Sequence, residues 1–379
     1  VSSYGTHLMG GQITANYLAT DSLGSHYIVE LTAYRDTMGI PMQMSATFDV
    51  EVMDTSGNWN YLFSNTVSYD TTSGGLIPTV TVYGVEVYIY TDTITLPGDG
   101  YYSIAWDECC RNGAIINMFD PLAESMQLIT YLTVDTVTPN SSPTYLTPPV
   151  AYLADDTLWQ YNPLPFDPDG DSLAWSMVVP LDDNGLVNGY EFLSDSIYSD
   201  SLGVFTLDSI TGEVSWDPRM LGNFVASFII EEFRNGSKIG EMRRDMQFIV
   251  IHDTTNFTPI ISNMQSVPTN SAGYPYVKIN PGVNYQLHLL GNDADPGDVL
   301  EMAAYGESFG LAVSPSLFHY TPTGNGNEIE GTFSWTPDIS HVRTQPYLTV
   351  FRTSDHMLYY DNTIQFEVTL GASTEIDEV

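Results

Sequence analysis

The chain has 379 residues, of which 43% are hydrophobic, so it can bury substantial cores and is not globally disordered. Ten Lys and Arg residues against 47 Asp and Glu residues give a net charge of −37, which would repel nucleic acid and anionic membrane surfaces and disfavours both as partners. No apolar stretch approaches the roughly 18 residues that a membrane-spanning helix needs, and no charged-then-apolar leader opens the chain. We expect a mature, secreted protein whose acidity either keeps it soluble or binds divalent cations.

The order of turns and apolar runs predicts strands throughout the chain. Runs rich in Val, Ile, Thr, Tyr and Phe, such as residues 80–90, alternate with Gly-rich and Asn-rich turns, such as 97–100 and 182–185. The best helix candidate, residues 121–126, is short. The length fits three β-sandwiches of roughly 110–140 residues each. We therefore predict an all-β protein of three tandem β-sandwich domains, Ig-like or cadherin-like, that run end to end.

Two linkers divide the chain. Residues 135–143 follow the strand-like segment 128–134, and residues 253–259 follow the strand-like segment 247–251. Each linker begins with Asp and continues with polar residues, Asn and Pro, and Pro ends a strand and stiffens a joint. These linkers predict domains at 1–138, 139–254 and 255–370, followed by an acidic tail at 371–379.

The chain contains only two cysteines, the adjacent Cys109 and Cys110. This number excludes a scaffold held together by several disulfides, and no Cys-x-x-Cys metal pattern is present. The pair can be two buried free thiols, it can close a disulfide on itself, or it can bond to another chain.

The second and third predicted domains resemble diverged copies of one repeat. Each opens with an acidic turn and later carries a Gly-to-Trp strand, a Phe-Arg pair and a Gln-Phe strand at similar spacing, which indicates a tandem duplication. The matching landmarks are residues 212–218 and 331–338, Phe233-Arg234 and Phe351-Arg352, and Gln247-Phe248 and Gln365-Phe366.

The acidic turn of the second domain contains Asp167, Asp169 and Asp171 around a glycine. Carboxylates two residues apart in a tight turn supply the oxygen ligands that calcium prefers, and without a cation they repel one another. We expect a calcium site here, with a solvated acidic turn as the alternative. More distant ligands would come from later strands; the candidates are Asp217, Glu231 and Glu232.

The third domain repeats this arrangement less completely. Its turn contains Asp293, Asp295 and Asp298, and the Glu pair of the second domain is replaced by Thr349-Val350. Asp338 and Asp355 are the residues that we expect to complete this site. The linker residues Asp135, Asn140, Asp253 and Asn256 are candidate ligands at the joints.

Two sets of motifs resemble known proteins. Asp-x-Asp-Gly-Asp followed by Thr-Gly-x-x-x-Trp and an Asn-x-x-Pro linker resembles cadherin-like, dystroglycan-type repeats. The segments 6–13, 34–36, 109–112 and 140–143 resemble the N-terminal region of large Bacteroidetes surface proteins, and this likeness extends over residues 1–253.

Such surface proteins often carry a gliding-motility-associated or type 9 secretion C-terminal domain. The resemblance therefore implies export through the type 9 secretion system and a role in surface adhesion or extracellular structure. Two departures stand out. The family pattern has a further Cys where this chain has Thr37, and no secretion domain follows residue 370, so we expect that such a domain has been cleaved or lies beyond this chain.

A short triplet recurs in this chain far more often than the roughly two copies expected by chance. It consists of Asp, then Ser or Thr, then an aliphatic residue or Met, and it resembles the O-glycosylation acceptor of Bacteroidetes. The alternative is that Asp-Ser/Thr simply begins strands after turns. The proposed acceptors are Ser22, Thr37, Thr93, Thr136, Thr157, Ser196, Ser201 and Ser209.

Signatures of catalysis are weak. Residues 306–310 match a nucleophile elbow around Ser308, but that motif requires a strand-turn-helix setting that the surrounding sequence does not predict. We expect a protein that is not an enzyme. The predicted function is a calcium-stiffened structural subunit of a surface fibre or sheath that associates with itself or another surface protein. The alternative is an adhesin module that binds glycan or protein.

Overall fold

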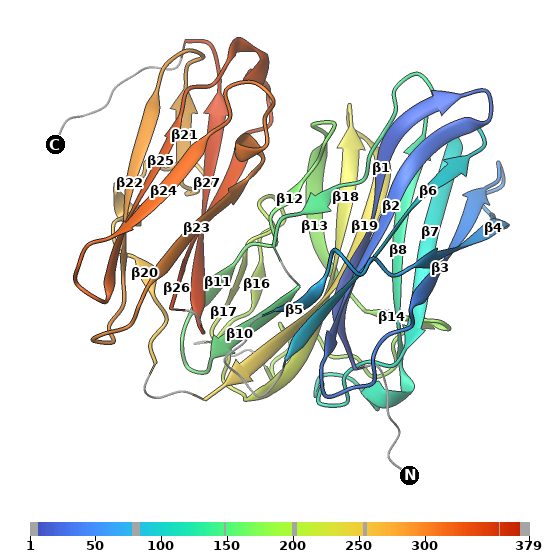
Figure 1. Ribbon diagram of the computed structural model, residues 1–379, viewed down its shortest axis with the longest axis horizontal. Helices are drawn as coiled ribbons and strands as arrows, with labels where there is room; N and C mark the ends of the chain where they lie inside the picture. Colours follow the sequence, from blue (N-terminus) through green and yellow to red (C-terminus); the bar gives the residue numbers. More distant parts are fainter. Residues whose placement is uncertain are drawn as a thin grey trace.

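The computed structural model describes residues 7–77, 84–147, 149–198, 203–252, 256–355 and 357–371. These residues form strands and turns with four single-turn 3-10 helices, and the described part contains no α-helix (Figure 1). The predicted all-β class is therefore confirmed. None of the helices in the described ranges is long or apolar enough to cross a membrane.

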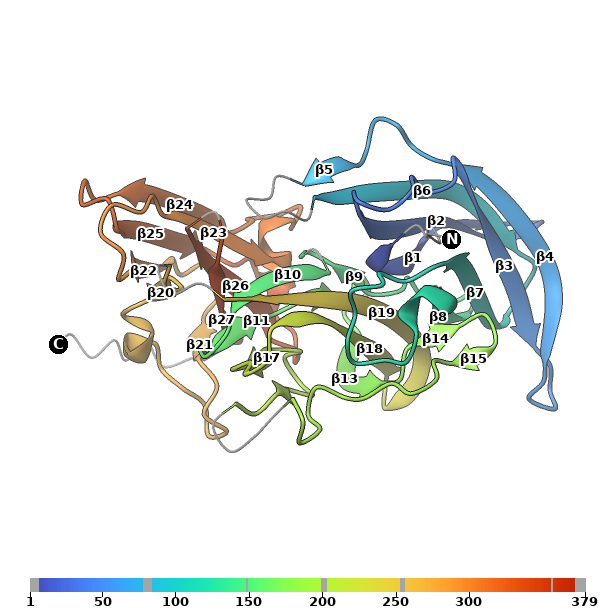
Figure 2. The same cartoon turned by 90° about the horizontal axis from the view of Figure 1, so that it is seen from below.

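The first structural unit, residues 8–134, curls around one hydrophobic core (Figure 2). Side chains alternate between core and solvent, as in β3, where Phe48 and Val50 are buried and their neighbours are not. The elements are β1 (Leu8–Asp21), β2 (Gly24–Asp36), β3 (Ser45–Met53), β4 (Trp59–Ser68), β5 (Gly75–Ile77), β6 (Val85–Leu96), β7 (Gly100–Cys109), the 3-10 helix η1 (Pro121–Ala123) and β8 (Ser125–Val134).

The second unit, residues 144–251, has an aromatic core. Trp216 is 1% exposed and packs on Phe248, which also contacts Trp159. The strands are β9 (Thr144–Tyr145), β10 (Val150–Ala154), β11 (Trp159–Tyr161), β12 (Pro165–Phe166), β13 (Ser172–Val178), β14 (Leu181–Asp182), β15 (Gly185–Leu186), β16 (Thr206–Leu207), β17 (Val214–Trp216), β18 (Gly222–Arg234) and β19 (Ser237–Ile251).

The first two units share one large curled sheet of 14 strands, with the central order β4-β3-β7-β8-β19-β1-β2-β6-β5. β19 pairs with both β8 and β1, for example through Met242 opposite Thr130 and Asp245 opposite Gly11. Hydrogen bonds of the sheet therefore join residues on either side of the predicted boundary at residue 138. The first two units are parts of one continuous sheet and not separate domains connected only by a linker. The long β19 reaches beyond its own unit, and no local sequence signal marks that continuation.

The third unit, residues 260–368, consists of two four-stranded sheets, β20-β22-β25-β24 and β21-β27-β26-β23. The rings of Phe333 and Phe366, whose centroids are 4.8 Å apart, stack in its core. Its elements are β20 (Ile260–Ile261), η2 (Met264–Ser266), β21 (Tyr276–Ile279), β22 (Tyr285–Asn292), β23 (Glu301–Gly306), η3 (Glu307–Phe309), β24 (Leu317–Pro322), β25 (Glu328–Trp335), η4 (Ile339–His341), β26 (Tyr347–Ser354) and β27 (Tyr359–Val368).

The third unit lies beside the second in the opposite direction, and not end to end with it as we expected (Figure 1). Ser172 lies at the end of the second unit that carries the β18–β19 hairpin. It accepts a hydrogen bond from Gln345, which lies at the opposite end of the third unit from the matching β26–β27 hairpin. The expected straight string is therefore wrong for these two units, because a short linker allows the chain to fold back when buried side-by-side contacts outweigh the extended arrangement.

Buried polar contacts fix this side-by-side packing. The backbone N–H of Asn162 donates to Asp361 (3.1 Å), and its side-chain amide donates to Thr363 (2.9 Å). Arg352 donates to Asp361 as well (2.7 Å) and stacks on Tyr359. Because Asn162 and Asp361 are both fully buried, separating the units would expose hydrogen-bonding groups that now satisfy one another.

Candidate metal sites at the two acidic turns

The first acidic turn lies between β12 and β13 and folds around one carboxylate. Asp167 Oδ1 accepts the backbone N–H groups of Asp169 and Asp171, each at 2.9 Å. Gly170 has a φ of 81°, which a side chain would disfavour. The turn therefore points the second oxygen of Asp167 inward.

Three carboxylates converge at this turn. Asp167, Asp171 and Glu232 each offer an oxygen within 4.8 Å of the other two. Asp167 is 6% exposed and Glu232 is 0% exposed. Asp167 Oδ2 and Glu232 Oε1 are buried without a hydrogen-bond partner, which is costly for a carboxylate unless a proton or a cation is present.

Burial has a clear electrostatic consequence for Glu232. Loss of solvent, followed by the nearby carboxyl group of Asp167, raises the pKa of Glu232 well above its usual range. Without a cation, this raised pKa favours a proton held between the Glu232 and Asp167 carboxyl groups. A bound cation would take the place of this proton and draw the three carboxylates together.

The linker between the first and second units contacts the same carboxylates. Asn140 donates its side-chain amide to Glu232 (3.0 Å), and the N–H of Ser141 donates to Asp169 (2.6 Å). Arg234 donates to Asp171 (2.5 Å) and to Asn140 Oδ1 (2.7 Å). Asn140 was predicted from the sequence as a ligand at this joint. Arg234 was recognised only as part of a repeated Phe-Arg pair, because no local pattern indicates that its side chain contacts the acidic turn.

The second acidic turn repeats this arrangement in the third unit. Asp293, Asp295 and Asp298 offer oxygens within 4.8 Å of one another. Asp293 Oδ1 accepts the N–H of Asp295 (2.8 Å), whereas its Oδ2 is buried without a partner. Asp293 is 2% exposed, and burial, followed by the charges of its acidic neighbours, raises its pKa to about 6.

The second linker also reaches its turn. Asn256 donates its side-chain amide to Asp355 (2.7 Å), and the N–H of Phe257 donates to Asp295 (2.6 Å). These contacts match those of Asn140 and Ser141 at the first turn. Within the described residues, no ion pair reaches the second turn, so it lacks the counter-charge that Arg234 gives the first.

Strand register shows which residues of the two turns are equivalent. Phe224 lies opposite Phe248, and Tyr347 lies opposite the matching Phe366. Counting from these pairs places Asp355 at the position of Glu232. Asp355, and not Thr349-Val350, is therefore the counterpart of the acidic pair.

The same register corrects the sequence match between the two Phe-Arg pairs. Phe351 has the position of Phe228 and not that of Phe233, because the β26–β27 hairpin is shorter than the β18–β19 hairpin: Phe351 to Phe366 spans 15 residues, and Phe228 to Phe248 spans 20. Arg352 accordingly pairs with Asp361 inside the interface, whereas Arg234 pairs with the acidic turn.

Several predicted ligands lie outside these clusters. Asp217 pairs with Arg219 (2.6 Å), and Glu231 pairs with Lys238 (2.7 Å) on the opposite face of β18 from Glu232. Asp338 caps η4 by accepting the N–H of Ser340. Asp135 accepts N–H groups of its own loop, at Val137 and Thr138. Asp253 lies outside the described residues.

The proposed glycan acceptors differ in exposure. Ser22, Thr93, Thr136, Ser196 and Ser209 are exposed, Thr37 and Thr157 are half-buried, and Ser201 lies outside the described residues. Asp21, Asp36 and Asp135 each accept the N–H two residues further on, which is the geometry of a turn. Both interpretations of the triplet, turn formation and glycan attachment, fit these positions.

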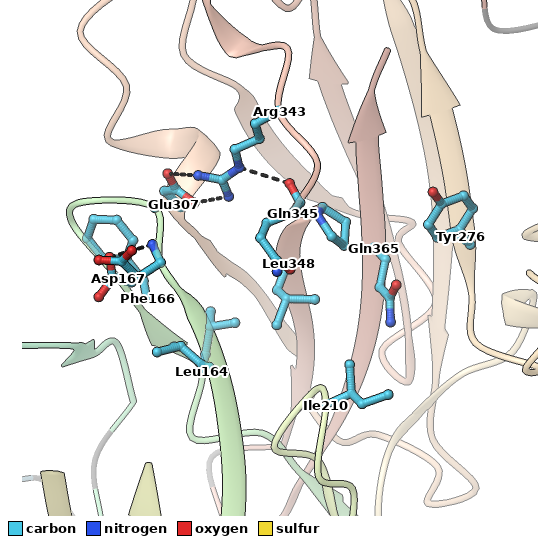
Figure 3. A pocket seen from close by; sticks show the side chains of 14 residues that line it. Leu164, Phe166, Asp167, Ile210, Tyr276, Glu307, Arg343, Gln345, Leu348 and Gln365 are labelled. Carbon is cyan, nitrogen blue, oxygen red and sulfur yellow. Dashed lines mark hydrogen bonds and ion pairs between the residues drawn. The ribbon is translucent and has the colours of Figure 1, made fainter. Parts of the chain in front are cut away.

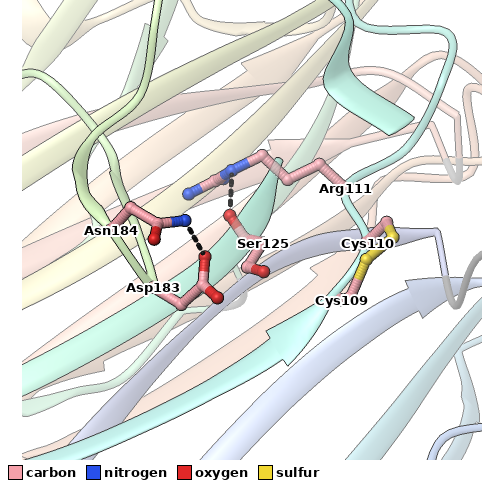
Figure 4. The surroundings of a disulfide bond; sticks show 6 residues. All are labelled: Cys109, Cys110, Arg111, Ser125, Asp183 and Asn184. Carbon is pink, nitrogen blue, oxygen red and sulfur yellow. Dashed lines mark hydrogen bonds between the residues drawn. A yellow bond between two sulfur atoms is a disulfide. The ribbon is translucent and has the colours of Figure 1, made fainter. Parts of the chain in front are cut away.

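Cys109 and Cys110 are joined by a disulfide at the end of β7 (Figure 4). The carbonyl of Cys110 accepts the N–H of Leu8, and the adjoining Arg111 is fully buried. Arg111 donates to the carbonyl of Ser125 (3.0 Å). The Cys-Cys-Arg-Asn motif therefore lies where the first unit meets the second.

The nucleophile-elbow match does not have the geometry of that motif. Ser308 lies in the single-turn helix η3, is 0% exposed, and shares a hydrogen bond of 2.7 Å with Ser316. The strand-turn-helix that would present a nucleophile to substrate is replaced by a short turn between strands.

Comparisons with known proteins identify no family. No protein-family model matches the chain, and no curated protein matches it. Among solved structures, the crystal structure of Rst D1-D2 matches at 12% identity and a TM-score of 0.20, over 60% of this chain and 99% of that one. The endo-fucoidan hydrolase MfFcnA4_H294Q, of glycoside hydrolase family 107, matches at 12% identity and a TM-score of 0.20, over 93% of this chain and 43% of that one.

Proposed function

We propose that this chain is a non-catalytic, extracellular structural subunit of a bacterial surface fibre or sheath, stiffened by calcium at its two acidic turns. The proposal rests on a contact that occurs at both acidic turns. At each turn, an Asn of the preceding linker donates to a carboxylate, and a nearby Asp oxygen is buried without a hydrogen-bond partner. Asn140 with Glu232 and Asn256 with Asp355 are the two instances. A cation held there would tie each linker to its unit.

A hard cation such as calcium fits these turns better than a softer transition metal does. The ligands that they offer are carboxylate and amide oxygens, which suit a hard cation, and the chain has no cysteine or histidine at either turn. Since the unfolded chain cannot gather these oxygens, calcium would bind the folded form selectively and stabilise it.

Rigidity supports a structural role. One sheet runs through the first two units, and buried hydrogen bonds lock the third unit against the second. The Cys109–Cys110 disulfide agrees with an oxidising, extracellular setting. The motif resemblance adds type 9 secretion and a Bacteroidetes cell surface, and the exposed Asp-Ser/Thr triplets add O-glycosylation.

Electron microscopy of native surface material tests this function. Regular filaments or sheaths that antibodies against this chain decorate along their length would support it. Isolated particles attached singly to the surface would support the second candidate, an adhesin module, which the cleft between the second and third units favours.

A further inference from the structure

The inverted packing of the third unit leaves a cavity between it and the second unit (Figure 3). This cavity has a volume of about 250 Å³, and a neighbouring cavity of about 610 Å³ shares Phe166 and Glu307 with it. Together they form one cleft, which we call the interunit cleft. Clefts between domains are the commonest places for ligands, and this size suits a small molecule or part of a polymer.

The walls of the cleft combine apolar and polar groups. Leu164 and Leu173 of the second unit and Leu348 of the third unit are apolar side chains that line the smaller cavity. Opposite the second unit, Arg343 donates two hydrogen bonds to Glu307, at 2.7 and 2.5 Å, and this planar pair faces the cavity (Figure 3). The pair therefore presents both donors and acceptors in a fixed arrangement.

Further hydrogen-bonding groups line the same cavity. Gln345 and Gln365 contribute amides. Gln345 is held by its hydrogen bond to Ser172 across the two units (2.6 Å). Gln365 is 5% exposed and belongs to β27, where its backbone lies opposite Leu348.

The cleft is accessible at two places. Ile210 borders the smaller cavity and is 62% exposed, and Leu146 borders the larger one and is 38% exposed. An elongated ligand can therefore enter along the cleft without separating the two units.

We infer that the interunit cleft binds a neutral saccharide. Sugar hydroxyls both donate and accept, which matches guanidinium, amide and carboxylate groups in one wall, and the C–H face of a sugar ring packs on Leu and Phe side chains. Arg343 is the one cationic side chain among the described residues that line the smaller cavity, and it is already paired with Glu307, so the cavity offers no unpaired positive charge to a sulfated or uronic sugar. A lipid chain is disfavoured because the polar groups would lose their water without replacement.

Titration of the purified full chain in calcium buffer tests this inference. The probes are neutral hexasaccharides of glucose, mannose, galactose and xylose, a sulfated galactan and an alanine-rich peptide, followed by calorimetry and by NMR of the sugar protons. We expect saturable binding of at least one neutral hexasaccharide and none of the sulfated polymer or the peptide.

Two matched pairs of variants locate the site. Ile210→Trp fills the mouth of the cleft, and Leu23→Trp adds the same ring at another exposed position, on the β1–β2 turn. Arg343→Gln removes the charged pair, and Arg219→Gln removes an ion pair on the surface of the second unit. Ile210→Trp and Arg343→Gln should weaken binding by about tenfold or more, as expected for a lost charge-assisted contact, and the two controls should bind as the parent does.

Absence of binding by every neutral hexasaccharide, preference for the sulfated polymer or the peptide, or equal binding by Ile210→Trp and Leu23→Trp would each overturn the inference. Since this site is additional to the proposed structural role, the two fail separately. Filaments without sugar binding would support the structural role and contradict the saccharide site. Sugar binding by a protein that forms no filaments would support the saccharide site and contradict the structural role.

Discussion

Arg111 and Asp245 form an ion pair of 2.7 Å in which both side chains are fully buried. Arg111 follows β7 of the first unit, and Asp245 lies in β19 of the second, beside β1. Arg111 also donates to the carbonyl of Leu181 (2.9 Å), so one guanidinium joins three segments from two units. This pair explains why an Arg directly follows the two cysteines.

Arg111→Met should lower the free energy of unfolding by about 3 to 5 kcal/mol, because it leaves the carboxylate of Asp245 buried without a partner. Urea denaturation followed by tryptophan fluorescence measures the loss. The double variant Arg111→Met with Asp245→Leu should recover much of it, since neither charge then remains. The exposed Arg219→Met is the control, and an equal loss in that variant would contradict the role of the buried pair.

Glu232→Gln should leave the calcium-free protein nearly as stable as the parent and reduce its stabilisation by calcium. Burial beside Asp167 raises the pKa of Glu232, which favours its neutral form when no cation is bound, and Gln resembles this neutral form. The amide cannot replace a carboxylate ligand, so the calcium response of the first turn should be lost. Calcium titration followed by thermal melting measures both effects.

The neighbouring Glu231→Gln is the matched control, because its side chain pairs with Lys238 on the other face of β18. It should respond to calcium as the parent does. A Glu232→Gln variant with an unchanged calcium response would exclude the first turn as a calcium site.

Glu213 should make the calcium-free protein less stable as the pH rises from about 4.5 to about 7. Burial raises the pKa of Glu213 from 4.5 to about 7 in the folded chain, where it lies near Asp361 and Asp208. Folding therefore takes up a proton in this window, and the free energy of unfolding falls with pH, by about 2 to 3 kcal/mol for this group.

The difference between the parent and Glu213→Gln isolates this contribution, because other buried carboxyls titrate in both. Urea denaturation at pH 5 and at pH 7.5 should show a smaller decline for the variant. Parallel declines in the two proteins would contradict the assignment.

Native material should carry O-glycans at exposed triplets before half-buried ones. We expect peptide mass spectrometry to find glycans at Thr93 and Thr136 more often than at Thr37 or Thr157, because a transferase needs access to the hydroxyl. An intact mass equal to that of the bare chain would show that the triplets serve only to form turns.

The sequence predicted features that depend on local pattern. Strand alternation and turn residues gave the all-β class, and the Asp-rich turn around Gly170 was identified because its carboxylates and its bend are adjacent in the chain. Trp216 and Trp335, which end the Gly-to-Trp strands of the predicted repeat, are both 1% exposed.

Features that depend on distant segments were not predicted. The pairing of β19 with β1 and β8 has no sequence signature, since any alternating strand can join either sheet. The counterpart of Glu232 was misplaced because equal spacing of the Phe-Arg and Gln-Phe landmarks concealed hairpins of different length. The inverted packing rests on Asn162 and Asp361, which meet only after the chain folds back.

Calorimetric melting of the full chain, stripped with a chelator and then measured with and without excess calcium chloride, tests the central claim most directly. Calcium at about 100 times its dissociation constant adds about 2.7 kcal/mol for each site, so the melting temperature should rise by about 5 to 10 °C. Superimposable melting curves from metal-free and calcium-supplemented protein would contradict a calcium-stiffened subunit.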